Sequence, residues 1–110
     1  MKIVFDHGTP LPLRAFLRDH TVQSAKSCGW DTLSNGELLA AAEAAGFEVL
    51  VTSDKNIRHQ QNLTRRVIAI VVLGNPQWPV LRLHTEIVIA AVNAALPGSY
   101  TEIEIPSLNG

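Results

Sequence analysis

Two aspartates follow apolar stretches that have the composition of buried strands. Asp6 comes directly after residues 2–5, and Asp54 comes three residues after the stretch 47–51. In open parallel sheets, ligands bind beyond the carboxyl ends of the strands, where the strand order reverses. Carboxylate oxygens suit Mg²⁺, which can orient a phosphate and activate water. If the two strands are neighbours, Asp6 and Asp54 form a metal site.

Simpler roles exist for these acids and for a third one. Aspartate after a strand is a frequent turn or N-cap residue. Glu37 falls on the first turn of an expected helix and is the third candidate ligand. Ser34 and Glu37 also match a capping box, in which each side chain satisfies the other residue's backbone N–H. The spacing favours the cap, and Asn35 offers a neutral oxygen ligand nearby.

Basic residues follow each aspartate along the chain. They are Arg14 and Arg18 after the first, and Lys55, Arg58, Arg65 and Arg66 after the second. If they flank one crevice, they bind phosphates around an acidic centre. The candidate nucleic-acid contacts are Arg14, Lys55, Arg58 and Arg65. A solvated surface position is the alternative for each of them.

Other kinds of site find little support. His7 and His59 are candidate ligands or proton carriers, but no HxxH or HExxH spacing indicates zinc. Neither GxGxxG nor GxxxxGK[ST] is present, so no phosphate-binding loop is indicated. Cys28 is the only cysteine, which excludes an intramolecular disulfide and is typical of a reducing cytoplasm.

Composition favours one soluble globular domain. The chain has 110 residues, 46% of them hydrophobic, and a formal net charge of −1. This charge argues against a uniformly basic nucleic-acid coat, although a local patch is compatible with it. The apolar runs are far shorter than the ~20 residues of a membrane span. We therefore expect a cytoplasmic protein that does not contact the membrane, with a single domain over residues 1–106 and a flexible tail at 107–110.

The elements alternate between strand and helix patterns. Strands are expected at residues 2–5, 21–24, 47–51, 67–73 and 100–105, and helices at 11–18, 38–45 and 79–96. A turn of helix is expected from Ala25 to Trp30, ended by Gly29, and residues 57–64 are a loop or a short helix. This order predicts a three-layer α/β fold with a mostly parallel, Rossmann-like sheet of four to five strands flanked by helices.

The order and spacing of four segments resemble a known family. The segments are 5–10, 29–30, 33–39 and 51–56. Together they resemble bacterial PIN-like proteins, formerly a domain of unknown function, which are similar to VapC-type toxin ribonucleases but shorter. The resemblance covers roughly residues 2–75 well and the remainder loosely. It implies a PIN-like fold, a Mg²⁺ or Mn²⁺ site of three or four acids, and hydrolysis of an RNA substrate.

Two positions depart from the pattern of that family. Asp6 and Asp54 match its acids, whereas Asn35 and Asn56 lie where further acids are usual. Replacing a carboxylate with an amide removes one charge, so metal affinity should fall unless Glu37 compensates. The resemblance therefore leaves two alternatives: an active ribonuclease, or a catalytically weak or inactive module that binds protein or RNA.

By analogy, the resemblance also implies partners. They are a small antitoxin protein, if the chain is the toxin of a toxin–antitoxin pair, and a second copy in a homodimer. A receiver-like phosphate-binding domain is a weaker third interpretation, because receivers need an acidic pair after the first strand. Asp6 is alone there.

Overall fold

The computed structural model describes residues 1–60 and 66–106, without the side chains of residues 59 and 60. Its sheet has five strands, each parallel to its neighbours, in the order β2-β1-β3-β4-β5. The strands are β1 (Lys2–Phe5), β2 (Thr21–Ser24), β3 (Val49–Thr52), β4 (Ala69–Leu73) and β5 (Tyr100–Ile103). The predicted α/β class with a parallel sheet between helices is confirmed. The expected tail, 107–110, lies outside the described residues.

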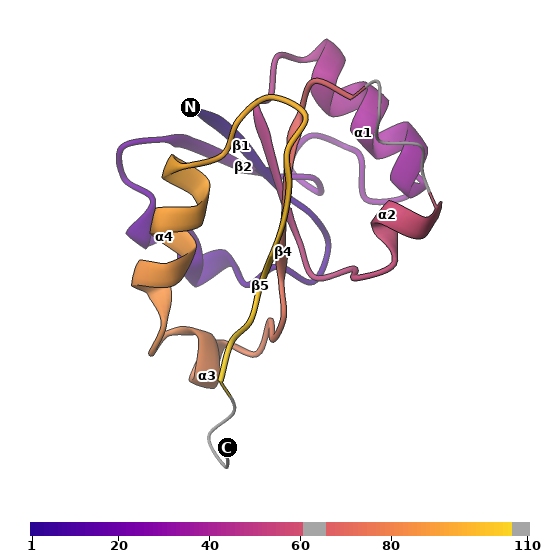
Figure 1. Ribbon diagram of the computed structural model, residues 1–110. Helices are drawn as coiled ribbons and strands as arrows, with labels where there is room; N and C mark the ends of the chain where they lie inside the picture. Colours follow the sequence, from indigo (N-terminus) through magenta and orange to yellow (C-terminus); the bar gives the residue numbers. More distant parts are fainter. Residues whose placement is uncertain (61–65, 107–110) are drawn as a thin grey trace.

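Helices cover both faces of this sheet (Figure 1). One face carries the 3-10 helix η1 (Leu11–Phe16) together with α3 (Trp78–Leu81) and α4 (Thr85–Asn93). The other face carries α1 (Asn35–Ala44) and α2 (Ile57–Gln60). No helix within the described parts of the chain is long and apolar enough to cross a membrane.

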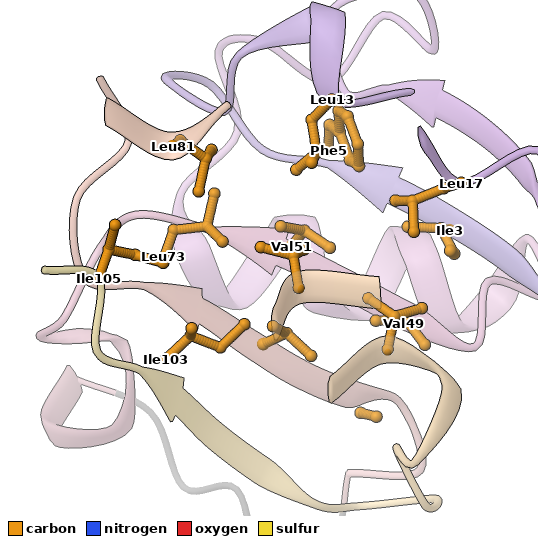
Figure 2. Close-up of a cluster of buried hydrophobic side chains, with 14 of the residues drawn as sticks. Ile3, Phe5, Leu13, Leu17, Val49, Val51, Leu73, Leu81, Ile103 and Ile105 are labelled. Atoms are coloured by element: carbon orange, nitrogen blue, oxygen red, sulfur yellow. The ribbon is translucent and has the colours of Figure 1, made fainter. Parts of the chain in front are cut away.

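Each face of the sheet has its own apolar core. Side chains alternate between the faces along a strand, so Val49 and Val51 enter the first core while Leu50 enters the second. Figure 2 shows the first core, where Leu13 and Leu17 pack against the strands. Strand β4 is buried along its whole length, as expected of a strand covered on both faces.

The strand order reverses between β1 and β3. From β1 the chain continues to β2 on one side, and it later returns through α1 to pair β3 with the other side of β1. The register places Phe5 opposite Val51. The residues that follow these two strands therefore lie side by side at the carboxyl edge of the sheet, where open α/β sheets bind ligands.

The ends of two expected helical segments follow the sequence signals. The turn at Ala25–Trp30 closes with Gly29 N–H donating to Lys26 O (3.0 Å) and Trp30 N–H donating to Ala25 O (2.9 Å). This Schellman pattern needs a left-handed residue, and Gly29 has φ 80°. Helix α1 begins at Ser34 with the complete capping box and ends before Gly46, as predicted.

Two helices differ from their expected extents. The segment predicted as a helix over 11–18 is the shorter η1, in which Pro12 has no N–H to donate. The segment predicted as one helix over 79–96 is divided into α3 and α4. The division falls at His84, whose φ of −131° and ψ of 28° lie outside the helical range.

Candidate functional site

Asp6 and Asp54 line the same cavity at the carboxyl edge of the sheet. The cavity has a volume of about 440 Å³. Its other lining residues come from the ends of β1 and β2, the turn after β1, and the segment that leads into α1. They are Phe5, His7, Gly8, Thr9, Leu11, Ser24, Ala25, Lys26, Trp30, Asp31, Leu33 and Asn35. Strands β1 and β3 are therefore neighbours, as a site shared by Asp6 and Asp54 requires.

The hydroxyl of Thr52 connects the two aspartates. It donates a 2.7 Å hydrogen bond to Asp6 Oδ2 and accepts a 3.1 Å hydrogen bond from the backbone N–H of Asp54. Thr52 is fully buried at the end of β3, so its rotamer is constrained by packing. One buried side chain thus orients the carboxylate of Asp6 and the backbone that carries Asp54.

Each carboxylate has further protein donors. Asp54 Oδ2 accepts from the side-chain amide of Asn35 (2.8 Å), and Asp54 Oδ1 accepts from the backbone N–H of Asn56 (2.9 Å). Asp6 Oδ1 accepts from the backbone N–H of His7 (2.7 Å). A carboxylate oxygen has two lone pairs, so these bonds orient both groups without exhausting their capacity to accept.

A tight turn after β1 holds Asp6 against β3. The backbone N–H of Asp6 donates to Val51 O (2.9 Å), and the buried hydroxyl of Thr9 donates to the same oxygen (2.9 Å). Gly8 has φ 90°, and a Cβ at this position would lie 3.3 Å from the Ser53 hydroxyl oxygen. Glycine permits both the left-handed backbone and the close approach of the two loops.

Glu37 has the capping role rather than a place in the cavity. Its carboxylate accepts from the backbone N–H of Ser34 (3.1 Å), while its own N–H donates to the Ser34 hydroxyl (3.3 Å). Hydrogen bonding of the Glu37 carboxyl by the Ser34 backbone N–H first, and by the Ser34 side chain second, holds its pKa below the ordinary value. Glu37 is not among the residues that line the cavity.

The predicted basic residues do not line the cavity within the described parts of the chain. Arg14 is exposed on η1, Lys55 lines a separate hollow beside β5, and Arg58 lies over the Tyr100 ring at 5.6 Å. Arg66 forms a 2.7 Å ion pair with Glu43 near the start of β4, at the opposite edge of the sheet. Arg65 and the side chain of His59 lie outside the described residues.

Three of the cavity residues that sequence reasoning missed as part of the site carry a charged or aromatic side chain from one segment. Lys26, Trp30 and Asp31 all lie on the segment between β2 and α1. Lys26 brings an ammonium group to the described lining of the cavity. Asp31 brings a carboxylate, in addition to those of Asp6 and Asp54. Gly29 and Trp30 form one of the four segments that resemble PIN-like proteins. The sequence did not indicate that this segment lines the same cavity as Asp6.

The donor set fits a hydrated Mg²⁺ or Mn²⁺ ion. Asp6 and Asp54 supply hard oxygen ligands and two negative charges, and Mg²⁺ is commonly held by one or two carboxylates while keeping several waters. Among the described residues, no three side chains of His, Cys, Asp or Glu are gathered closely enough to hold a metal by themselves. A cation held at this place would have Asp6 and Asp54 as its protein ligands, with water completing the shell.

No known protein family, curated protein or solved structure matches the chain.

Proposed function

We propose that the protein is a Mg²⁺- or Mn²⁺-dependent ribonuclease of the PIN-like class. The observation that carries the proposal is the shared cavity of Asp6 and Asp54, at the switch point of a parallel sheet, with Thr52 linking the two. Ligand binding at this place is general for open α/β sheets. The resemblance of residues 2–75 to PIN-like proteins supports the same class.

The residues of the cavity have distinct roles in this proposal. Asp6 and Asp54 hold the cation, which supplies a charge for the phosphate and an activated water. Thr52 and Asn35 position the two carboxylates, because each donates a short hydrogen bond to one of them. His7 lines the cavity and can carry a proton, and the Lys26 ammonium can neutralise a phosphate.

Cleavage of single-stranded RNA in the presence of Mg²⁺ or Mn²⁺ tests the proposal. The variants are Asp6→Asn and Asp54→Asn, which keep the size of each side chain and remove its charge. Asp19→Asn is the matched control, because Asp19 is an exposed aspartate between η1 and β2. We expect the parent and the control to cleave and the two cavity variants to lose activity. Equal activity in all four proteins would contradict the proposal.

A specific observation favours a second candidate, a non-catalytic PIN-like binding module. Asn35 places an amide, hydrogen-bonded to Asp54 Oδ2, where the PIN-like pattern has a further acid, and the described residues contain no group of three acids that could hold a metal. Such a module would fold and bind a partner without binding a cation. Calorimetry that detects no Mn²⁺ binding by the folded parent protein would favour this candidate over the ribonuclease.

The resemblance also motivates a cellular setting. We propose a cytoplasmic toxin whose partner is a small antitoxin protein or a second copy of the chain. Apolar side chains support a partner surface on the η1 and α4 side, where Phe16 and Ile87 are exposed. Analytical ultracentrifugation over a range of concentrations tests the homodimer, and a monomer throughout would contradict it.

A further inference from the structure

A second group of side chains, which the metal proposal does not use, lines the same cavity. It contains the indole of Trp30 and the aliphatic side chains of Leu11, Ala25 and Leu33. The cavity thus combines acids at the strand ends with an aromatic and apolar lining. Its volume of about 440 Å³ lies within the range of small-molecule sites, ~300–1,000 Å³, which are mostly apolar with a few placed polar groups.

The backbone holds Trp30 in a defined position. The Schellman turn joins Trp30 N–H to Ala25 O, and Leu33 N–H donates to Trp30 O (3.2 Å). The indole meets the buried Phe47 ring edge to face, with centroids 5.7 Å apart and planes at 78°. Trp30 is nevertheless only partly buried, and it lines the cavity.

The charges that line this cavity favour the base of a nucleotide over its phosphate. The described lining carries the carboxylates of Asp6, Asp31 and Asp54 and the ammonium of Lys26. This excess of negative charge repels a phosphate unless a cation lies at the aspartates. A nucleobase is uncharged and planar, and bases stack on aromatic side chains without regard to sequence.

We propose that Trp30 forms a nucleobase subsite, in which an unpaired base of single-stranded RNA stacks on the indole. Lys26 is four residues before Trp30 on the same turn and lines the same cavity, so it can meet a phosphate that flanks the stacked base. The choice of RNA rests on the proposed function. Binding of the base itself requires no metal, and the two proposals can therefore fail separately.

Nuclear magnetic resonance with an uncharged nucleoside tests the subsite directly. The chain has two tryptophans, so its spectrum contains two indole N–H signals, and Trp78→Phe assigns them. Adenosine is added to the protein in the presence of EDTA. We expect saturable shifts of the Trp30 indole, while the Trp78 indole, which packs against Phe16, remains unchanged. No shift at Trp30, or equal shifts at both indoles, would overturn the proposal.

Variants of Trp30 provide a second readout through the backbone amides of Lys26 and Leu33. Trp30→Leu removes the aromatic face and should weaken adenosine binding by about fivefold to a hundredfold, the range expected for loss of one stacked base. Trp30→Phe keeps an aromatic ring against Phe47 and should retain most of the binding. Urea unfolding identifies any loss of folding in Trp30→Leu. Equal adenosine affinity in the folded Trp30→Leu variant and the parent would overturn the subsite.

Longer ligands distinguish RNA from a free nucleotide as the source of the base. With Mn²⁺ present, a short single-stranded RNA should bind more tightly than adenosine monophosphate, and duplex RNA should bind more weakly than the single strand. Tighter binding of the mononucleotide would overturn the assignment to RNA. Saturable adenosine shifts in a protein that cleaves no RNA would support the subsite and contradict the ribonuclease. Undiminished RNA binding by folded Trp30→Leu, together with RNA cleavage by the parent, would contradict the subsite and support the ribonuclease.

Discussion

The Thr52 hydroxyl donates a 2.7 Å hydrogen bond to Asp6 Oδ2, although the two residues are 46 positions apart in the chain. The pairing of β1 with β3 brings them together, and burial of Thr52 fixes the donor. The same hydroxyl accepts the backbone N–H of Asp54. The two acids are therefore coupled through one side chain before any ligand binds.

Thr52→Val should reduce both stability and metal affinity. The substitution keeps the shape of the side chain but leaves the Asp54 N–H without its acceptor and Asp6 Oδ2 without the Thr52 donor. An unpaired polar group in a buried site costs about 1–3 kcal/mol of unfolding free energy. Urea unfolding measures this loss. Thr101→Val, on edge strand β5, is the control and should change stability by no more than about 0.5 kcal/mol. A similar effect of both variants would contradict the role of Thr52.

Asn35→Asp should make thermal stability depend on the metal. The Asn35 amide nitrogen lies 2.8 Å from Asp54 Oδ2, so a carboxylate at this position would repel Asp54 in the absence of a cation. We expect a lower melting temperature in EDTA than that of the parent, and a larger increase on addition of Mn²⁺. Thermal unfolding with and without Mn²⁺ measures both changes.

Asn93→Asp is the control for this variant. Asn93 lies at the end of α4, where its side chain contacts His20 on the segment that leads into β2, at the opposite edge of the sheet. Its effect should not depend on Mn²⁺. An equal Mn²⁺ response in Asn35→Asp and Asn93→Asp would contradict a cation site at Asp54.

Ser34→Ala and Glu37→Gln should separate the capping role of Glu37 from a ligand role. Loss of the Ser34 cap should lower the unfolding free energy by about 1 kcal/mol. Glutamine still accepts the Ser34 N–H, so Glu37→Gln should change stability little and should leave Mn²⁺ affinity unchanged. Titration calorimetry of Glu37→Gln is the measurement. A loss of Mn²⁺ affinity comparable to that in Asp54→Asn would identify Glu37 as a ligand after all.

Tyr100 should ionise at unusually high pH in the folded protein. Burial first, then the 2.9 Å hydrogen bond to Glu102 and the charge of that carboxylate, raise the pKa of Tyr100 to about 12. The ordinary tyrosine pKa is about 10. Because the unfolded chain loses this proton first, stability should be unaffected below pH ~10 and should fall as the pH rises toward 12.

Ultraviolet absorbance of tyrosinate measures this ionisation, because Tyr100 is the only tyrosine. Glu102→Gln removes one of the causes and should move the titration of the folded protein to lower pH. Ionisation near the ordinary pKa in the folded parent, unchanged in Glu102→Gln, would contradict the environment found for Tyr100.

Much of the fold follows from local signals in the sequence. Short apolar runs predicted β1, β3 and β4, and alternation of polar and apolar residues predicted β5. Ser34 predicted the start of α1, and Gly29 predicted the end of the turn before it. These signals depend on a few neighbouring residues, so one sequence suffices to find them. The extents of η1 and of the α3–α4 pair were harder to predict. The residues from α3 to α4 have a helical composition throughout, but the backbone conformation of His84 interrupts the helix.

The composition of the cavity was only partly predictable, because it depends on where segments pack. Asp6 and Asp54 were found from their positions after strands. Arg66 follows Asp54 closely in sequence, but the chain has by then returned to the opposite edge of the sheet, where Arg66 pairs with Glu43. Trp30 is distant from both aspartates in sequence, and the turn after β2 brings it to the cavity.

The central claim is that Asp6 and Asp54 jointly bind one divalent cation. Isothermal titration calorimetry with Mn²⁺, applied to the parent, Asp6→Asn, Asp54→Asn and Asp19→Asn, tests it most directly. We predict one Mn²⁺ per chain in the parent and in Asp19→Asn, and loss of that binding in each of the other two variants. Unchanged Mn²⁺ affinity in Asp6→Asn and Asp54→Asn, or no binding by the folded parent, would contradict the claim.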